Sequence, residues 1–233
     1  MSIKIDLKIF LFLLLFLLTS QIDMYILLMI FACIHELAHL CTGIILGFKP
    51  EELKITPIGL QVSFKIKCEE YNQRIINGNS LGIKKTVIAS AGPIINFLIV
   101  VLCIIFGKLV ILNPQNSLIL NIIYANFLIG IFNLLPIYPL DGGRIVNEIL
   151  HIFIGLKESY QYTHIISKVT VIVLTMISSV VILYLQNIAI IIILAYLWII
   201  VIRENRKYQM RKEIETLCKY YKKACKMDKT MIK

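Results

Sequence analysis

Residues 24–48 read MYILLMIFACIHELAHLCTGIILGF, an apolar stretch that encloses His35-Glu36-Leu37-Ala38-His39. On a helix, His35 and His39 lie one turn apart on one face, and Glu36 lies about 100° round the axis. Two imidazoles at this spacing can share a zinc ion, and the glutamate can then act as a base on water. Ionisable groups among roughly 20 apolar residues are expensive in lipid, so this run indicates a functional site.

The composition is that of a membrane protein. Of the 233 residues, 58% are hydrophobic, and the mean hydropathy is +0.83. The fold class we expect is therefore an all-α polytopic membrane protein with about six transmembrane helices and a short β-hairpin. The apolar segments predict spans at about residues 5–20, 24–48, 86–112, 117–140, 163–185 and 188–202.

The basic residues predict the orientation and account for the formal net charge of +10. The connections at residues 21–23, 113–116 and 186–187, on one side of the membrane, contain no Lys or Arg. The basic residues gather on the other side, so the positive-inside rule places both termini in the cytoplasm. Residues 1–202 then form one membrane domain, followed by a basic cytoplasmic tail at 203–233. The tail can be a simple juxtamembrane anchor or a docking surface for anionic lipid or an acidic partner. Because the membrane accounts for the charge, we expect no nucleic-acid partner.

One polar segment between the apolar runs predicts a β-hairpin. Residues 53–67 read LKITPIGLQVSFKIK, are rich in β-branched side chains and carry Pro57-Ile58-Gly59 at the centre. The Asn- and Gly-containing residues 68–84 that follow are typical of a flexible loop. The hairpin is either a connector or a strand edge that pairs with an extended substrate, and the sequence leaves both interpretations open.

A catalytic zinc needs a third protein ligand and an open position. Asp141 lies at the end of the fourth predicted span, in NLLPIYPLDGGR at residues 133–144. Its prolines and glycines break the helix, and broken backbone at membrane depth is tolerated only where it lines a cavity or is buried in protein. Alone, Asp-Gly-Gly could be a turn or a helix start. Beside HExxH, Asp141 is the natural third ligand, and His151 and His164 are weaker candidates.

Three motifs together resemble the site-2 protease family of intramembrane zinc metalloproteases, peptidase M50. They are HELAH at 35–39, ASAGPIIN at 89–96 and the segment at 133–144. The resemblance covers about residues 24–150, which would form the catalytic core. Small residues such as Gly92 would let the third span approach the catalytic helix closely.

The resemblance also implies roles for individual residues. It makes His35, His39 and Asp141 the ligands of one zinc ion per chain and Glu36 the catalytic glutamate. The hairpin resembles the family's membrane-associated β-hairpin, although Leu60 follows Gly59 where the family usually has a second glycine. We expect five further residues to position substrate: Asn96, Asn133, Pro136, Ile58 and Gly59.

Within the family, the chain looks most like the stage-IV sporulation protease (FB type), which activates a membrane-associated sigma-factor precursor. We find no insert long enough for a PDZ domain, and residues 203–233 are too few for the nucleotide-sensing CBS domain that this branch often carries. This resemblance implies a pro-sigma factor as substrate, membrane-protein inhibitors as partners and a location in the forespore outer membrane. Another membrane-bound regulator, such as an anti-sigma factor, is the alternative substrate. The oligomeric state stays open.

The expected reaction is hydrolysis of a peptide bond near the cytoplasmic face. A cation transporter could also use His35, Glu36, His39 and Asp141 as an intramembrane relay. However, the sequence shows no inverted repeat and no second set of ionisable residues for the outer half of the path. The complete ligand set disfavours a catalytically silent scaffold. Prenyl-protein (CAAX) metalloproteases also carry an intramembrane HExxH but lack the Pro-x-x-Pro-Leu-Asp-Gly segment.

Overall fold

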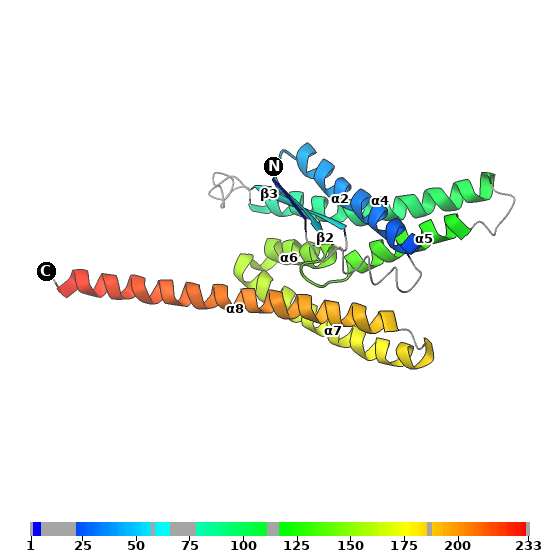
Figure 1. The fold of residues 1–233 in the computed structure, drawn as a ribbon. Helices are drawn as coiled ribbons and strands as arrows, with labels where there is room; N and C mark the ends of the chain where they lie inside the picture. Colours follow the sequence, from blue (N-terminus) through cyan, green and yellow to red (C-terminus); the bar gives the residue numbers. More distant parts are fainter. Residues whose placement is uncertain are drawn as a thin grey trace. The chain divides into compact units, whose positions relative to one another are not determined.

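The computed structural model describes residues 2–5, 22–56, 59–65, 78–110, 117–185 and 188–231. The chain divides into two compact units, of which unit 1 holds Met1–Pro136 and Leu140–Thr163, and unit 2 holds Ile137–Pro139 and His164–Lys233. Figure 1 shows the elements in chain order: β1 (Ser2–Ile5), α2 (Ile22–Ile45), β2 (Lys49–Thr56), β3 (Gly59–Lys65), α4 (Gly78–Val110), α5 (Ser117–Leu134), α6 (Asp141–Ile154), α7 (Leu156–Leu185) and α8 (Ile188–Met231).

Three helical segments among the described residues are long and apolar enough to cross a membrane. They are Ile22–Ile45, Ser80–Phe106 and Glu158–Ser179, and Leu118–Leu134 is a shorter apolar helix. Large hydrophobic side chains stay exposed along these segments, as lipid-facing helices require. The first predicted span lies outside the described residues except for Ile5, which is the last residue of β1.

Helix α4 is the central element of unit 1. It packs against α2, α5 and α6, and α2 also packs against α5. Small residues permit these contacts: a Cβ at Gly130 of α5 would lie 3.1 Å from the Phe97 ring of α4, and a Cβ at Gly82 would lie 3.3 Å from Ile152 of α6. The crossings are therefore close ones, in which one helix backbone lies against side chains of the next.

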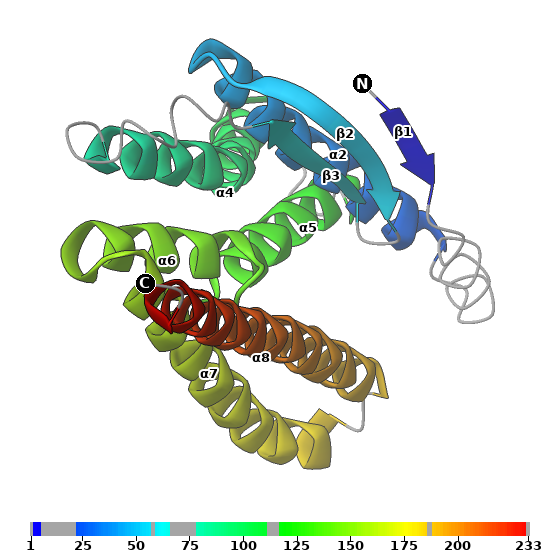
Figure 2. The same ribbon diagram turned by 90° about the vertical axis from the view of Figure 1, so that its left-hand side faces the viewer.

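The three strands form one sheet in the order β1-β2-β3, and Figure 2 shows them side by side, with β2 and β3 against α2. β1 runs parallel to β2, and β2 runs antiparallel to β3 with Lys49 opposite Lys65 and Thr56 opposite Gly59. This antiparallel pair lies where the sequence predicts a hairpin. The sheet is held on α2 at Gly43, where the Phe64 ring occupies the space that a Cβ would need.

Two predicted element boundaries were wrong. Residues 78–84, predicted as loop, form the first two turns of α4, because packing against α6 at Gly82 outweighs the weak helix propensity of Asn and Gly. α5 ends at Leu134 rather than at residue 140. α8 runs without interruption from Ile188 to Met231, and the division at residue 202 between membrane domain and tail stays a prediction.

Unit 2 includes a tripeptide from the loop before α6. Ile137 is fully buried, and the Tyr138 N–H donates to Oγ of Ser167 at 2.9 Å. The His164 ring of α7 lies 6.1 Å from the Tyr138 ring and 5.0 Å from the Tyr208 ring of α8, measured between centroids. The tripeptide thus packs against α7, whose His164 ring in turn contacts α8.

The ion pair between α4 and α6 predicts a measurable effect on stability. Nζ of Lys85 lies 3.4 Å from Oε1 of Glu148, whose side chain is only 12% exposed, against 31% for Lys85. Lys85→Met leaves that carboxylate buried without its lysine partner, so we expect the free energy of unfolding to fall by about 2–3 kcal/mol. Denaturant titration in detergent micelles measures it.

The matched control is Lys207→Met on α8. Lys207 pairs with Glu204 within one turn of α8, where the two side chains are 50% and 16% exposed, so its loss should lower the free energy of unfolding by no more than about 1 kcal/mol. Equal effects of the two variants would show that the α4–α6 ion pair contributes no more than an exposed one.

Candidate metal centre

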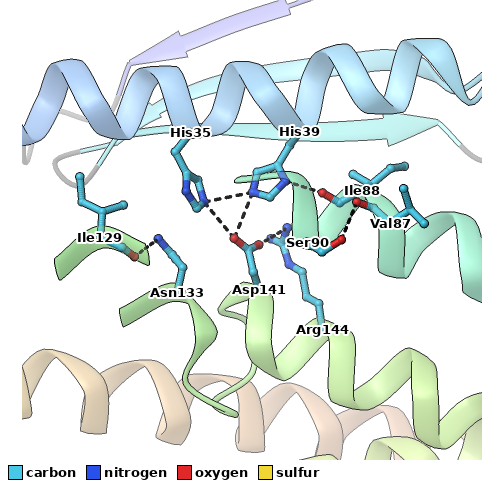
Figure 3. A network of polar contacts seen from close by, with 9 residues as sticks. All are labelled: His35, His39, Val87, Ile88, Ser90, Ile129, Asn133, Asp141 and Arg144. Atoms are coloured by element: carbon cyan, nitrogen blue, oxygen red, sulfur yellow. Dashed lines mark hydrogen bonds and ion pairs between the residues drawn. The ribbon is translucent and has the colours of Figure 1, made fainter. Parts of the chain in front are cut away.

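Two helices of unit 1 bring three ligand-type side chains together. His35 and His39, one turn apart on α2, are 2% and 3% exposed, and Asp141, the first residue of α6, is 5% exposed. Oδ2 of Asp141 lies 2.9 Å from Nε2 of His35 and 3.0 Å from Nε2 of His39, and the two Nε2 atoms are 3.1 Å apart. Figure 3 shows the three side chains converging on one point.

The hydrogen bonding of His39 decides what that point can hold. Nδ1 of His39 lies 2.6 Å from the carbonyl oxygen of Ile88, and because a carbonyl only accepts, Nδ1 must carry the proton. In the neutral ring, Nε2 then presents a lone pair toward the Asp141 carboxylate and Nε2 of His35. Three buried electron-pair donors facing one another are satisfied together by a cation, and the pattern is that of a metal-ligating histidine held by its other nitrogen.

The distances between the three ligand atoms also fit zinc. Ligand atoms about 2.0–2.1 Å from a tetrahedral zinc ion lie about 3.3 Å from each other. The observed separations of 2.9–3.1 Å need only a few tenths of an ångström of outward movement to match. Two imidazoles and one carboxylate also form a ligand set of catalytic zinc sites, which keep the fourth position open.

Two glycines make the approach of the helices possible. A Cβ at Gly92 of α4 would lie 2.5 Å from Nε2 of both His35 and His39, in the space of the metal centre. A Cβ at Gly142 would overlap the main chain of Leu134 and Leu135. The predicted close approach of the segment around Gly92 to the helix that carries His35 and His39 is confirmed.

Two charged residues lie next to the three ligands, one of them in the chain and one in space. Glu36 follows His35 on α2 and is half-buried. Nη1 of Arg144, one turn along α6, lies 3.7 Å from Oδ1 of Asp141, on the side away from the histidines. The carboxylate of Asp141 therefore faces the two histidines with one oxygen and a positive charge with the other.

The other predicted residues have varied surroundings. Nδ2 of Asn133 donates to the carbonyl of Ile129 at 3.1 Å, within its own helix. Asn96 is fully buried, and neither atom of its amide has a hydrogen-bond partner among the described residues. Pro136 is half-buried just beyond α5, Gly59 is the first residue of β3, and Ile58 lies outside the described residues.

Sequence reasoning gave no role to two groups of this centre. The Ile88 carbonyl belongs to the main chain, so no residue type marks it. Arg144 was visible beside Asp141 in the motif, and its spacing of three residues on a helix was the signal that it could reach the carboxylate. Asp-Gly-Gly alone could have been only a helix start, and Asp141 does begin α6. Its side chain also faces the two histidines.

Comparisons with known proteins agree with this geometry. Residues 112–177 match the family model for peptidase family M50. The chain is 30% identical over 146 residues to a zinc metalloprotease of Methanocaldococcus jannaschii, a match that covers 62% of this chain and 39% of that protein. The chain thus spans well under half the length of this curated relative.

A solved structure gives the wider match. The site-2 protease from Methanocaldococcus jannaschii superposes with a TM-score of 0.61 at 25% sequence identity, covering 87% of this chain and 89% of that one. The matches support a place in the peptidase M50, or site-2 protease, family. They do not extend to the sporulation branch, which remains a proposal.

Gly92 gives a test of the metal centre that needs no substrate. Gly92→Ala places a methyl group 2.5 Å from both Nε2 atoms, so the histidines must move apart from Asp141. We expect zinc affinity to fall at least about 100-fold, the upper range for disturbing the surroundings of metal ligands. Competition with a chelator in detergent measures this affinity.

Gly130→Ala is the control, because its Cβ meets only the Phe97 ring at 3.1 Å. That variant should bind zinc as the wild type does. Wild-type affinity in Gly92→Ala would contradict the geometry of the centre.

Proposed function

We propose that this chain is a zinc metalloendopeptidase that hydrolyses a peptide bond of a membrane-associated protein near the cytoplasmic face. The observation that carries the proposal is the meeting of His35, His39 and Asp141 at one buried point, with the lone pair of His39 fixed toward it. The peptidase M50 match and the likeness to a site-2 protease support it.

The residues divide the chemistry among them. His35, His39 and Asp141 would hold the zinc ion, which supplies a Lewis acid for the scissile carbonyl and for water. Glu36, next to His35 in the chain and half-buried on the same helix, takes the proton of the attacking water and delivers it to the leaving amine. The buried, unpartnered amide of Asn96 offers a donor and an acceptor for the substrate backbone.

The β-sheet supplies a place for an unwound substrate. A substrate helix hides its carbonyls in its own hydrogen bonds, and unwinding it in an apolar setting costs free energy unless the backbone finds new partners. β3 is an edge strand of the sheet and packs on α2, the helix that carries the two histidines. We propose that the substrate pairs with this edge while its peptide bond faces the metal centre.

The topology and the substrate are also proposals. The charge distribution favours a multi-pass protein with both termini cytoplasmic, which would set the centre toward the cytosol. Resemblance to the stage-IV sporulation protease favours a pro-sigma factor as substrate, in regulated intramembrane proteolysis at the forespore outer membrane. An anti-sigma factor anchored in the membrane is the alternative.

Glu36→Gln tests the central claim. The change preserves shape but removes the base, so we expect bound zinc to stay at one ion per chain while cleavage falls by at least about 10²–10⁴-fold. Co-expression with a membrane-anchored pro-sigma factor, or with an anti-sigma factor in parallel, shows cleavage by a mobility shift. Zinc content is measured on the purified protein.

The control is Glu204→Gln, which changes a glutamate of α8 in the same way and should leave cleavage intact. A fully active Glu36→Gln variant would remove the proposed mechanism. If a chelator left cleavage unchanged and the protein carried zinc across liposome membranes, the result would instead favour the transporter.

The hairpin gives a second test, directed at the substrate rather than the metal. Replacing residues 58–61 with a Gly-Ser sequence should weaken strand pairing, so we expect cleavage to fall about tenfold or more with zinc content unchanged. Glu51→Gln, an exposed change on β2, is the control. Loss of zinc in step with cleavage would show that the hairpin maintains the metal centre instead.

A further inference from the structure

The two oxygens of Asp141 have different surroundings. Oδ2 lies 2.9 Å and 3.0 Å from Nε2 of His35 and His39. Oδ1 points away from the histidines and lies 3.7 Å from Nη1 of Arg144, as Figure 3 shows. Asp141 is buried, whereas the Arg144 side chain is 38% exposed. Oδ2 thus faces the two histidines, and Oδ1 faces the guanidinium of Arg144.

This division bears on how many bonds the carboxylate gives a metal ion. Carboxylates bind metals through one oxygen or through both. A catalytic zinc site needs three protein ligand atoms and one position free for the reaction. If both Asp141 oxygens bound, they would take four positions together with the two histidines. Water at the reaction position would then be a fifth donor, and no position would be left for the substrate carbonyl.

Arg144 is placed to prevent that outcome. It follows Asp141 by three residues on α6, so both side chains share one face of the helix. A guanidinium attracts the nearby oxygen and repels a second cation from it. The positive charge therefore makes Oδ1 a poor metal donor and leaves Oδ2 as the favoured one.

We infer that Arg144 is a positioning residue that restricts Asp141 to a single metal-binding oxygen and so keeps the fourth position open. The inference rests on the proposed metal centre. It assigns Arg144 no contact with substrate and no proton transfer. Its effect should appear in the coordination of the metal, and in turnover rather than in substrate binding.

The experiment compares the wild-type full-length protein with Arg144→Gln, Arg144→Lys and Lys207→Gln. Lys207→Gln is the matched control because it also removes the cation of an i,i+3 pair, at a distance along the chain on α8. Each protein is loaded with Co²⁺ for its visible absorption spectrum and with Zn²⁺ for X-ray absorption, which counts the donor atoms. Geometry is diagnostic in both measurements.

We expect Arg144→Gln to gain one oxygen donor and to lose intensity in the visible bands, as four-coordinate cobalt becomes five-coordinate. Arg144→Lys, which keeps the charge, and Lys207→Gln should match the wild type. In the cleavage assay, Arg144→Gln should show kcat lowered by about tenfold, with KM and zinc content unchanged.

Three results would overturn the inference. They are wild-type spectra in Arg144→Gln, an added donor in Arg144→Lys equal to that in Arg144→Gln, and loss of metal from Arg144→Gln with its helical circular dichroism intact. Absence of metal from the wild type would overturn the proposed function as well. Coordination is measured without substrate. These results can therefore contradict the role of Arg144 while the proposed protease function still stands.

Discussion

Three electron-pair donors, Nε2 of His35, Nε2 of His39 and Oδ2 of Asp141, meet within about 3 Å in a site that water barely reaches. Such an arrangement is stable only when positive charge is shared among the donors, by a proton or by a metal ion. The rest of unit 1 can be understood as the structure that keeps these atoms together. α2 and α6 carry them, and neither helix alone could form the site.

α4 joins the two ligand-bearing helices through a single stripe of its surface. Lys85, Ile88, Gly92 and Asn96 recur at helical spacing and so share one face. Lys85 pairs with α6, the Ile88 carbonyl holds a histidine of α2, and Gly92 leaves room where all three helices meet. Asn96 adds a buried amide to the same stripe. Each position acts through a different property: charge, main chain, absence of a side chain, and hydrogen-bonding capacity.

The sequence was informative where chemistry depends on residue type. His35, Glu36, His39 and Asp141 could be named because ionisable groups in an apolar chain are rare, and Gly92 because small residues permit close helix contact. Boundaries that depend on packing could not be predicted: residues 78–84 are helical because of contact with α6, and no local signal marks the parallel strand β1. The hairpin region was visible in its β-branched residues. Pairs such as Lys85 with Glu148 join residues 63 positions apart, so only the fold reveals them.

The hydrogen bond from His39 to the Ile88 carbonyl differs in kind from the other contacts of the centre. A side-chain partner could be replaced by a single mutation, but every residue type at position 88 would present the same carbonyl. Only a displacement of α4 itself, or a rotation of its backbone, can withdraw that acceptor. The ring tautomer of His39 is therefore a property of helix position and not of residue identity, and the lone pair that Nε2 offers depends on how α4 lies against α2.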